Sequence, residues 1–381
     1  MESSIYVEKK KSIQAFLLSF LDKESDFEEH HTNFINCIND QRLLDDPHEV
    51  KMLLHMIYII SNNHNRTTNF FDKIDSLLLF LKPTIQIFFS AIDVFNIFKG
   101  NKRILLSLFE NKIIIINQQI AEIMKSNKYI ASDYPIYFFP ELQPFFQAIE
   151  LYSYQMEINQ MNQNGDIMND FALKRKIGEN HNYICSVMRD DNIEAFIIYI
   201  NKYGLNSSSF VHKSAFETHQ FLLKNQPTLL EYAAFFGSIQ IFKFLINNGA
   251  QPRPQLWSCA IFGCDPELIN ILIEKNIAPA FCSYKECINT AIKCHHNEIA
   301  NYIYNNFFQT QNIEEVFDSA TKYYNFMLFP KNFNSIQFYN FCLSDFYNLV
   351  NIILQEKQVD INAVIVLMPI FILSNLKHVF I

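Results

Sequence analysis

Hydrophobic positions are spaced as in amphipathic helices through most of the first 150 residues. Ile13, Phe16, Leu17, Phe20 and Leu21 stand at i, i+3, i+4, i+7 and i+8, so they line one face of a helix. The same spacing predicts further helices over Met52–Ile60, Ile74–Leu81, Ile85–Lys99 and Ile104–Met124. We therefore expect residues 1–150 to form a helical N-terminal domain.

Proline, glycine and polar stretches mark the expected ends of these segments. Pro83 should end the helix before it, because proline lacks the N–H that continues a helix, and Gly100 stands just past another helix end. Ile113–Ile116 alone resembles a buried strand, but the periodicity around it favours helix. Residues 151–180 turn polar and predict a linker or exposed helix. We interpret their basic triplet Lys174–Lys176 as a solvated helix face.

One 23-residue unit, Thr228–Ala250, has the pattern of a helix-turn-helix hairpin. Thr228 suits a helix N-cap, and Gly237 suits a tight turn with positive φ. Gly249 suits the end of the second helix. Two adjacent alanines allow close approach of a neighbouring helix, and the second helix carries an apolar stripe formed by Ile241, Phe242, Leu245 and Ile246.

Weaker copies of this hairpin surround it. In Leu256–Ala278, Cys259, Ala260 and Gly263 take the places of the two alanines and the turn glycine, and Pro266 stands at a helix start. Further copies cover Ile184–Lys202, Ile288–Asn306 and Asn348–Leu354.

Thr228–Ala250 resembles the ankyrin repeat, whose pattern is T-P-L-H-x-A-A-x-x-G-H-x-E-I-V-x-L-L-L-x-x-G-A. Asp360–Ala363, with the sequence D-I-N-A, resembles the link between such repeats. Arg175–Asn180 running into Ile184-Cys185, together with Glu231–Gly237, is similar to a group of protist ankyrin proteins. In that group a long helical N-terminal region, which Asn96–Leu105 also resembles, precedes a divergent array. The resemblance implies an α-solenoid that binds a partner on its concave face.

The chain departs from the ankyrin pattern in three ways. Leu229 and Glu231 replace the usual Pro and His. About 46 residues separate the first and second units and 26 or 27 the second and third, against an ordinary spacing of about 33. The long gap predicts an inserted loop near Ser207–Lys224, and the short gap predicts a trimmed connection. The chain also stops where another repeat would begin, so residues 363–381 are expected to be an apolar tail and a truncated repeat.

Composition and charge exclude several classes of function. The chain has 381 residues, of which 49% are hydrophobic and 18% charged, and its net charge of −8 disfavours nucleic acid as a partner. Its seven glycines form no G-x-G-x-x-G or phosphate loop, and the chain has no G-x-S-x-G and no H-E-x-x-H. We therefore expect no enzyme activity, no cofactor and no small-molecule substrate. Eight cysteines without a disulfide framework favour the cytoplasm or nucleus.

The resemblance also gives candidate binding residues. Side chains just before the Gly237 turn, and at the matching positions of the other copies, should project onto the concave face. We predict that they bind a protein partner through an aromatic patch flanked by charge, because aromatic residues and Arg dominate interface energetics. The residues are Arg189, Asp190, Phe235, Phe236, Ile261, Phe262, Lys293 and Cys294. The alternative is that Phe235 and Phe236 pack within the chain.

Three other functions are alternatives to protein binding. The apolar run Ala363–Leu373 could attach the chain to a membrane, but it is interrupted by Pro369 and shorter than the ~20 residues of a spanning helix. Zinc could bind among Cys282, Cys287, Cys294, His295 and His296, although their spacing matches no zinc motif. A thiol chemistry on Cys294 lacks an evident third orienting group.

The sequence thus predicts an all-α chain with four parts. Residues 1–150 form the helical domain, 151–180 the polar linker or helix, 181–362 the divergent ankyrin repeats and 363–381 the tail. The expected function is that of a non-enzymatic protein-interaction module or scaffold.

Overall fold

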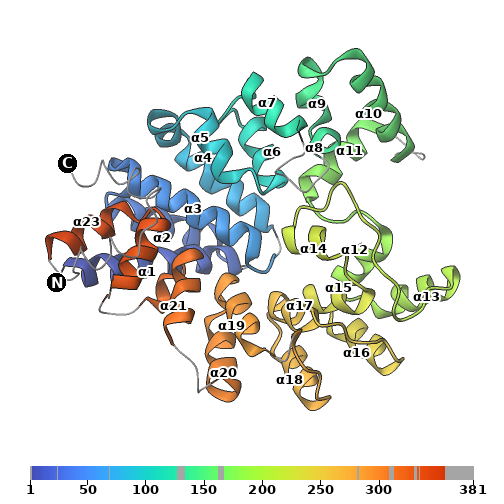
Figure 1. The fold of residues 1–381 in the computed structure, drawn as a ribbon. Coiled ribbons are helices and arrows are strands. Elements are labelled where there is room, and N and C mark those ends of the chain that lie inside the picture. The colour runs from blue at the N-terminus through green and yellow to red at the C-terminus, as the bar shows by residue number, and fades with distance from the viewer. Residues whose placement is uncertain are drawn as a thin grey trace. The chain divides into compact units, whose positions relative to one another are not determined.

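The computed structural model describes residues 2–23, 25–67, 69–126, 134–161, 167–280, 283–308, 313–329, 333 and 335–356. Their regular elements are helices, which confirms the all-α class (Figure 1). The predicted Asp360–Ala363 link, the tail over 363–381 and Cys282 lie outside the described residues. No described helix is long and apolar enough to cross a membrane.

The chain forms two packing units. The first, here the terminal unit, comprises Met1–Ile60, Arg66–Phe70 and Tyr284–Ile381, and the second, the middle unit, comprises Ser61–Asn65 and Phe71–Ser283. This grouping differs from the predicted division at residue 150, because the first sixty residues belong to the same unit as the C-terminal hairpins. Periodicity along one helix shows which face is buried but not which distant element covers it.

In the terminal unit, helices from both ends of the chain pack together. α1 contacts α2, η4 and α23, so the blue and red segments of Figure 1 lie side by side in this unit. The elements are α1 (Glu2–Asp22), α2 (Phe27–Asp40), η1 (Leu43–Asp45), most of α3 (Pro47–Asn63), α19 (Tyr284–Lys293), α20 (Asn297–Phe307), α21 (Ile313–Lys322), η4 (Phe326–Leu328), α22 (Ser335–Leu343) and α23 (Tyr347–Gln355).

Buried polar groups fix how these helices pack. Lys10 of α1 is 3% exposed and pairs with Glu49 of α3, and Asn348 of α23 donates its amide N–H to the same carboxylate at 2.7 Å. Gln14 donates to the buried Asn325 side chain at 3.1 Å. These bonds satisfy polar groups that would be costly to bury alone, so they favour one register of α1 against the C-terminal hairpins.

The middle unit contains α4–α18. Its elements are α4 (Phe70–Phe88), α5 (Ala91–Phe98), α6 (Lys102–Glu110), α7 (Gln118–Lys125), α8 (Tyr134–Tyr137), α9 (Phe139–Leu142), η2 (Gln143–Phe145), α10 (Ala148–Met161), α11 (Ile167–Ile177), α12 (Tyr183–Arg189), α13 (Ile193–Tyr203), α14 (Gln220–Asn225), α15 (Leu229–Phe235), α16 (Ile239–Asn247), α17 (Leu256–Gly263) and α18 (Pro266–Glu274).

Several predicted helix boundaries are wrong. α4 continues through Pro83, which lies on its exposed face. The segment 85–99 is divided at Ser90, whose side chain caps α5. The segment 104–124 is divided after α6, and Ile113–Ile116 is neither helix nor strand but part of the connection to α7. Local periodicity did not reveal the caps that interrupt these helices.

The basic triplet 174–176 is only partly the predicted solvated face, because Lys176 is exposed but Arg175 is buried. Arg175 is 5% exposed, and its Nη1 donates to both carboxylate oxygens of Glu141, at 2.7 and 2.9 Å. Its guanidinium also donates to the Tyr137 carbonyl at 3.1 Å. The Arg175 side chain therefore joins α11 to α8 and α9, and the charge is buried because it is paired.

Three helical hairpins of the middle unit are stacked. α12 pairs with α13, α15 with α16, and α17 with α18, while α15 contacts both α12 and α17. The second helices of the first two hairpins, α13 and α16, are also in contact. The ring centroids of Phe196 and Phe244 lie 6.2 Å apart between them. Each hairpin thus buries apolar surface against its neighbour as well as within itself.

The same turn ends the first helix of successive hairpins. One residue has positive φ, and the N–H of the next residue bonds to a carbonyl five positions earlier, as in a Schellman motif. Examples are Asn192 to Val187, Ser238 to Ala233, His296 to Ala291, Asn325 to Ala320 and Phe346 to Phe341, at 2.9–3.1 Å. The positive-φ residues of this turn and its equivalent after α17 are Asp191, Gly237, Cys264, His295, Tyr324 and Asp345.

The prediction that Gly263 is the turn glycine of the third hairpin is wrong by one residue. Cys264 takes the left-handed conformation, with φ of 54°, while Gly263 ends α17. A Cβ on Gly263 would lie 2.2 Å from the Ala234 carbonyl oxygen of α15. Glycine is therefore required here for close approach of two helices, and not for a positive φ.

Candidate binding site

The predicted aromatic patch is largely buried. Phe235 is 7% exposed and Phe262 2%, and their ring centroids are 5.1 Å apart. Ile261 is fully buried, whereas Phe236 is half-buried and Asp190 exposed. The structure thus brings Phe235, Phe236 and Phe262 together, but it leaves only the edge of this cluster at the surface.

Residues 205–226, here called the insertion, cover the patch. They occupy the predicted long gap, and they consist of an irregular stretch followed by α14. The ring centroid of His219 lies 4.6 Å from that of Phe235 and 5.1 Å from that of Phe262. The ring centroids of Phe221 and Phe262 are 4.9 Å apart. Intrachain packing, the alternative considered for Phe235, is therefore what the structure has.

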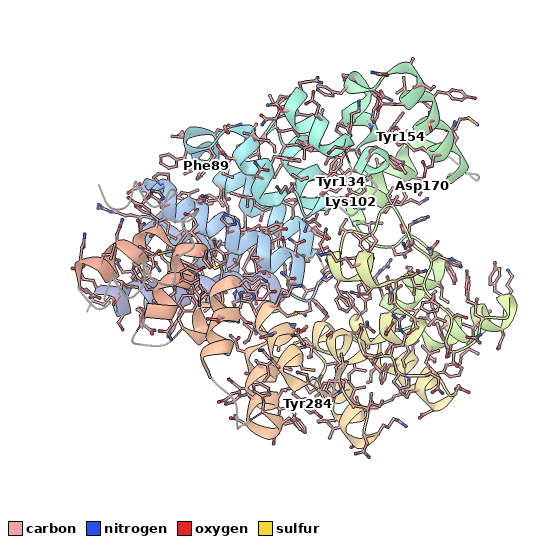
Figure 2. The ribbon with its side chains drawn as sticks, in the orientation of Figure 1. Phe89, Lys102, Tyr134, Tyr154, Asp170 and Tyr284 are labelled. Carbon is pink, nitrogen blue, oxygen red and sulfur yellow. The ribbon has the colours of Figure 1, made fainter. Side chains whose placement is uncertain are left out.

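Hydrogen bonds hold the insertion against the preceding helices. The Thr218 hydroxyl donates to the Gly178 carbonyl at 2.6 Å, and the Gln220 amide donates to the Gly100 carbonyl at 2.7 Å. Lys102, which lies beside α8 and Tyr134 in Figure 2, donates to the Ala215 carbonyl at 2.7 Å and is 2% exposed. The insertion is therefore a fixed part of the middle unit.

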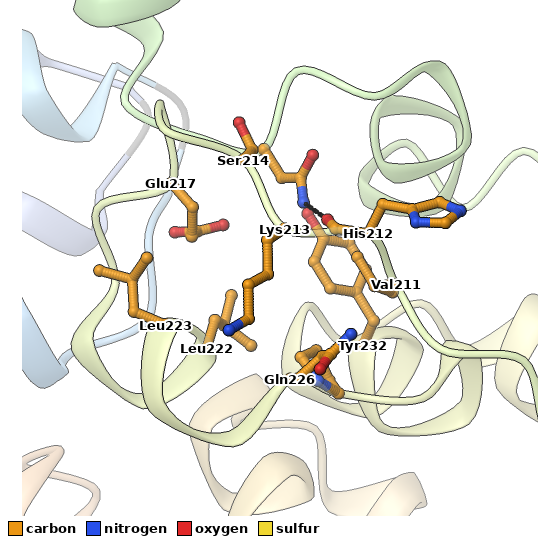
Figure 3. A pocket seen from close by; sticks show the side chains of 11 residues that line it. Val211, His212, Lys213, Ser214, Glu217, Leu222, Leu223, Gln226 and Tyr232 are labelled. Carbon is orange, nitrogen blue, oxygen red and sulfur yellow. Dashed lines mark hydrogen bonds between the residues drawn. The ribbon is translucent and has the colours of Figure 1, made fainter. Parts of the chain in front are cut away.

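A pocket of about 320 Å³ lies between the insertion, the start of the second hairpin and the turn before α12 (Figure 3). Most of its wall comes from the insertion, and the remainder comes from the start of the second hairpin and the turn before α12. The lining residues are Asn180, Val211, His212, Lys213, Ser214, Glu217, Leu222, Leu223, Gln226, Pro227 and Tyr232.

Arg189 does not line this pocket but is hydrogen-bonded to two residues that do. Its guanidinium donates to the Asn180 carbonyl at 3.0 Å and to the Tyr232 hydroxyl at 2.8 Å, and both of these residues line the pocket. Burial raises the pKa of Tyr232 well above its usual value, so the hydroxyl stays protonated. Arg189 was predicted to contact a partner, and in the structure it orders two walls of the pocket.

The charged groups of the pocket differ in exposure. Glu217 is 4% exposed, and its Oε1 accepts backbone N–H bonds from Thr218 at 2.9 Å and from His219 at 2.8 Å. Lys213 is exposed at the rim. The carboxylate is thus held rigidly by the backbone, whereas the ammonium is on a long side chain that can adjust to a ligand.

The remaining predicted residues, Lys293 and Cys294, belong to the terminal unit. Lys293 lies with its ammonium 5.9 Å from the Tyr323 ring centroid, and Cys294 is fully buried at the end of α19. Burial raises the pKa of the neighbouring Cys287 thiol to about 12. The described residues include no group of three His, Cys, Asp or Glu side chains placed to hold a metal ion.

Comparison of the chain with models of known protein families, with curated proteins and with solved structures gives no match.

Sequence reasoning located the insertion but not the pocket that it forms. Lys213 and Glu217 lie outside the hairpin pattern, so no repeat position drew attention to them.

Proposed function

We propose that the chain is a non-enzymatic protein-interaction module whose stacked hairpins form a divergent ankyrin-type array. The recurring Schellman turn carries this proposal, because it gives hairpins of different sequence the same path at the end of the first helix. Stacked hairpins of this kind present an extended surface suited to another protein. Buried free cysteines, such as Cys185 and Cys259, support the cytoplasm or nucleus as the compartment.

The partner surface that we propose is smaller than the predicted patch. Asp190 is exposed at the end of α12, and the Arg189 guanidinium lies 5.9 Å from the Phe236 ring. These side chains provide an exposed acidic group, a partly buried basic group and one partly accessible aromatic ring at adjacent turns. Phe235 and Phe262 support that surface from below, since they are buried against the insertion.

Site-specific photocrosslinking tests the proposal. A benzophenone amino acid is placed at position 190 or 236 of the full chain, and at Asn270, exposed on α18, as the control. We expect one defined protein to crosslink from 190 and 236 and not from 270, and we expect Asp190→Lys to reduce its capture at least about tenfold through charge reversal. Equal crosslinking from all three positions, or none from a correctly folded chain, would reject the proposal.

A further inference from the structure

The three stacked hairpins of the middle unit end at an exposed face of α13. The hairpins follow one another in the order α12–α13, α15–α16 and α17–α18, and α13 lies at the edge of this stack in Figure 1. Ile198 of α13 is 68% exposed. Its counterpart in the second hairpin is Phe244, because each lies seven residues after the positive-φ turn residue. Phe244 packs toward Phe196 of the preceding hairpin, so Ile198 faces the place that a hairpin before α12 would occupy.

A glutamate, an isoleucine and a lysine, spaced four residues apart, occupy the same positions in α13 and in α18. They are Glu194, Ile198 and Lys202 in α13, and Glu267, Ile271 and Lys275 in α18. In α18 both charged residues contact the preceding hairpin. Glu267 pairs with Lys243 of α16, and the Lys275 ammonium donates to the Asn247 amide oxygen of α16 at 3.4 Å. The glutamate and the lysine of the third hairpin thus help to hold the stack together.

In α13 the equivalent charged residues have no preceding hairpin to contact. Glu194 and Lys202 are both exposed, and neither forms an ion pair with any residue that the structure describes. Three tyrosine rings of the same hairpin add to its exposed apolar surface. The Tyr199 ring centroid lies 5.6 Å from that of Tyr183 and 4.5 Å from that of Tyr203. The terminal hairpin of a soluble array normally has a polar outer face, so this composition indicates that another chain covers it.

The charges of α13 are arranged so that this end face, formed by Glu194, Ile198 and Lys202, complements a second copy of itself. Glu194 lies four residues before Ile198 and Lys202 four residues after it, so each charge is about 6 Å from Ile198 along the helix axis. Two α13 helices that cross antiparallel at Ile198 therefore bring each Glu194 opposite the partner's Lys202. A parallel arrangement would place like charges opposite each other, which is unfavourable. Antiparallel pairing about a two-fold axis also has the symmetry of the commonest homo-oligomers.

We propose that the chain forms a symmetric homodimer through the end face of its stacked hairpins. Ile198 packs against the partner's Ile198 at the centre of the interface, and each Glu194 pairs with the partner's Lys202. This interface does not depend on the proposed protein-binding surface, because Asp190 and Phe236 are not part of it.

Sedimentation of the purified full chain over a range of micromolar concentrations tests the proposal. We expect the average mass to rise from 44.9 kDa toward twice that value as the concentration increases. Ile198→Glu places two carboxylates at the centre of the dimer and should leave the chain monomeric at every concentration. Ile149→Glu is the matched control, because Ile149 lies on α10 outside the end face and is 78% exposed, and it should leave the dimer unchanged.

Charge reversals test the antiparallel arrangement. Glu194→Lys alone and Lys202→Glu alone each create two like-charge pairs across the two-fold axis, and each should weaken the dimer at least about tenfold. The double variant Glu194→Lys/Lys202→Glu restores unlike pairs and should recover the wild-type affinity within about threefold. A mixture of the two single variants should form a mixed dimer for the same reason. Circular dichroism and Trp257 fluorescence verify that each variant is folded.

Three results would overturn the dimer interface. They are a wild-type chain that stays monomeric at every concentration, a dimer that the folded Ile198→Glu variant retains, and a double charge reversal that associates as weakly as the single variants. A monomeric chain would mean that a different protein, rather than a second copy, covers the end face. The sedimentation experiment contains no other protein, so its failure is distinguishable from a failure of photocrosslinking at positions 190 and 236.

Discussion

Adding one methyl group at Gly263 tests the claim that close approach of two helices determines this position. A Cβ there would meet the Ala234 oxygen at 2.2 Å and the Gly237 nitrogen at 3.0 Å. Both atoms belong to the backbone, so no side-chain rotation relieves the overlap. α15 and α17 must therefore separate, and the apolar contacts between them must weaken.

The magnitude follows from two opposing effects. In an ordinary helix, replacing glycine with alanine stabilises by about 1 kcal/mol. Overpacking a filled interface costs about 1–3 kcal/mol and occasionally more, and a backbone contact places Gly263→Ala at the upper end. We expect a net loss of about 2 kcal/mol in the free energy of unfolding, which corresponds to roughly 4–8 °C in Tm for a unit of this size.

The single tryptophan makes the assay local. Trp257 is 1% exposed in α17, and its indole N–H bonds to the Ile277 carbonyl at 2.7 Å. Its fluorescence during urea unfolding therefore follows the hairpin that the substitution affects. Gly204→Ala is the control, because its φ of 62° is strained but nothing lies within 4 Å of the added Cβ, so about 1 kcal/mol is expected. A Gly263→Ala variant as stable as the wild type would refute the reasoning.

Three further substitutions test other parts of the structure. Thr228→Ala removes the capping box with Glu231 and should lower the unfolding free energy by about 1 kcal/mol in urea, whereas Thr228→Ser should retain it. Arg189→Met removes the hydrogen bonds to Asn180 and Tyr232 and should lower the free energy of unfolding in urea by about 2 kcal/mol, with Asp190→Asn as the control. Burial, with Lys51 nearby, lowers the pKa of His55 from 6.5 to about 4, so its neutral form stabilises the fold above pH 6.5 and this contribution is lost toward pH 4. His55→Phe should therefore flatten the pH dependence of unfolding over that window, and an NMR titration midpoint near 6.5 in the wild type would contradict this.

The all-α class could be predicted because it depends on local spacing. Ile13, Leu17, Phe20 and Leu21 are buried on one face of α1, as their spacing indicates, but Phe16, which was predicted to share that face, is 41% exposed. What covers that face could not be predicted, because α1 contacts η4 and α23 from the other end of the chain. Single polar side chains, such as Lys10 and Asn325, help to determine which helices pack together, and their partners lie far away in sequence.

The candidate site was predictable only in part, for a related reason. The gap near Ser207–Lys224 indicated an insertion, but its fold depends on distant carbonyls at Gly100 and Gly178. Those bonds direct His219 and Phe221 onto Phe235, which buries the predicted patch. A repeat pattern assigns positions to a surface only when nothing else in the chain covers it.

The turn between the helices explains how hairpins of such different sequence share one backbone path. A left-handed residue is needed after each first helix, and glycine meets this need without strain only at Gly237 among the turns described above. Asp191 and Asp345 hold the same conformation with short polar side chains that tolerate it, whereas Cys264, His295 and Tyr324 pay a conformational cost of about 1–2 kcal/mol each. The turn keeps this strained conformation because the hydrogen bond to the carbonyl five residues earlier and the burial of the two flanking helices stabilise it. Substituting glycine at His295 or Tyr324 should therefore relieve strain, so backbone geometry rather than residue type is what these hairpins share.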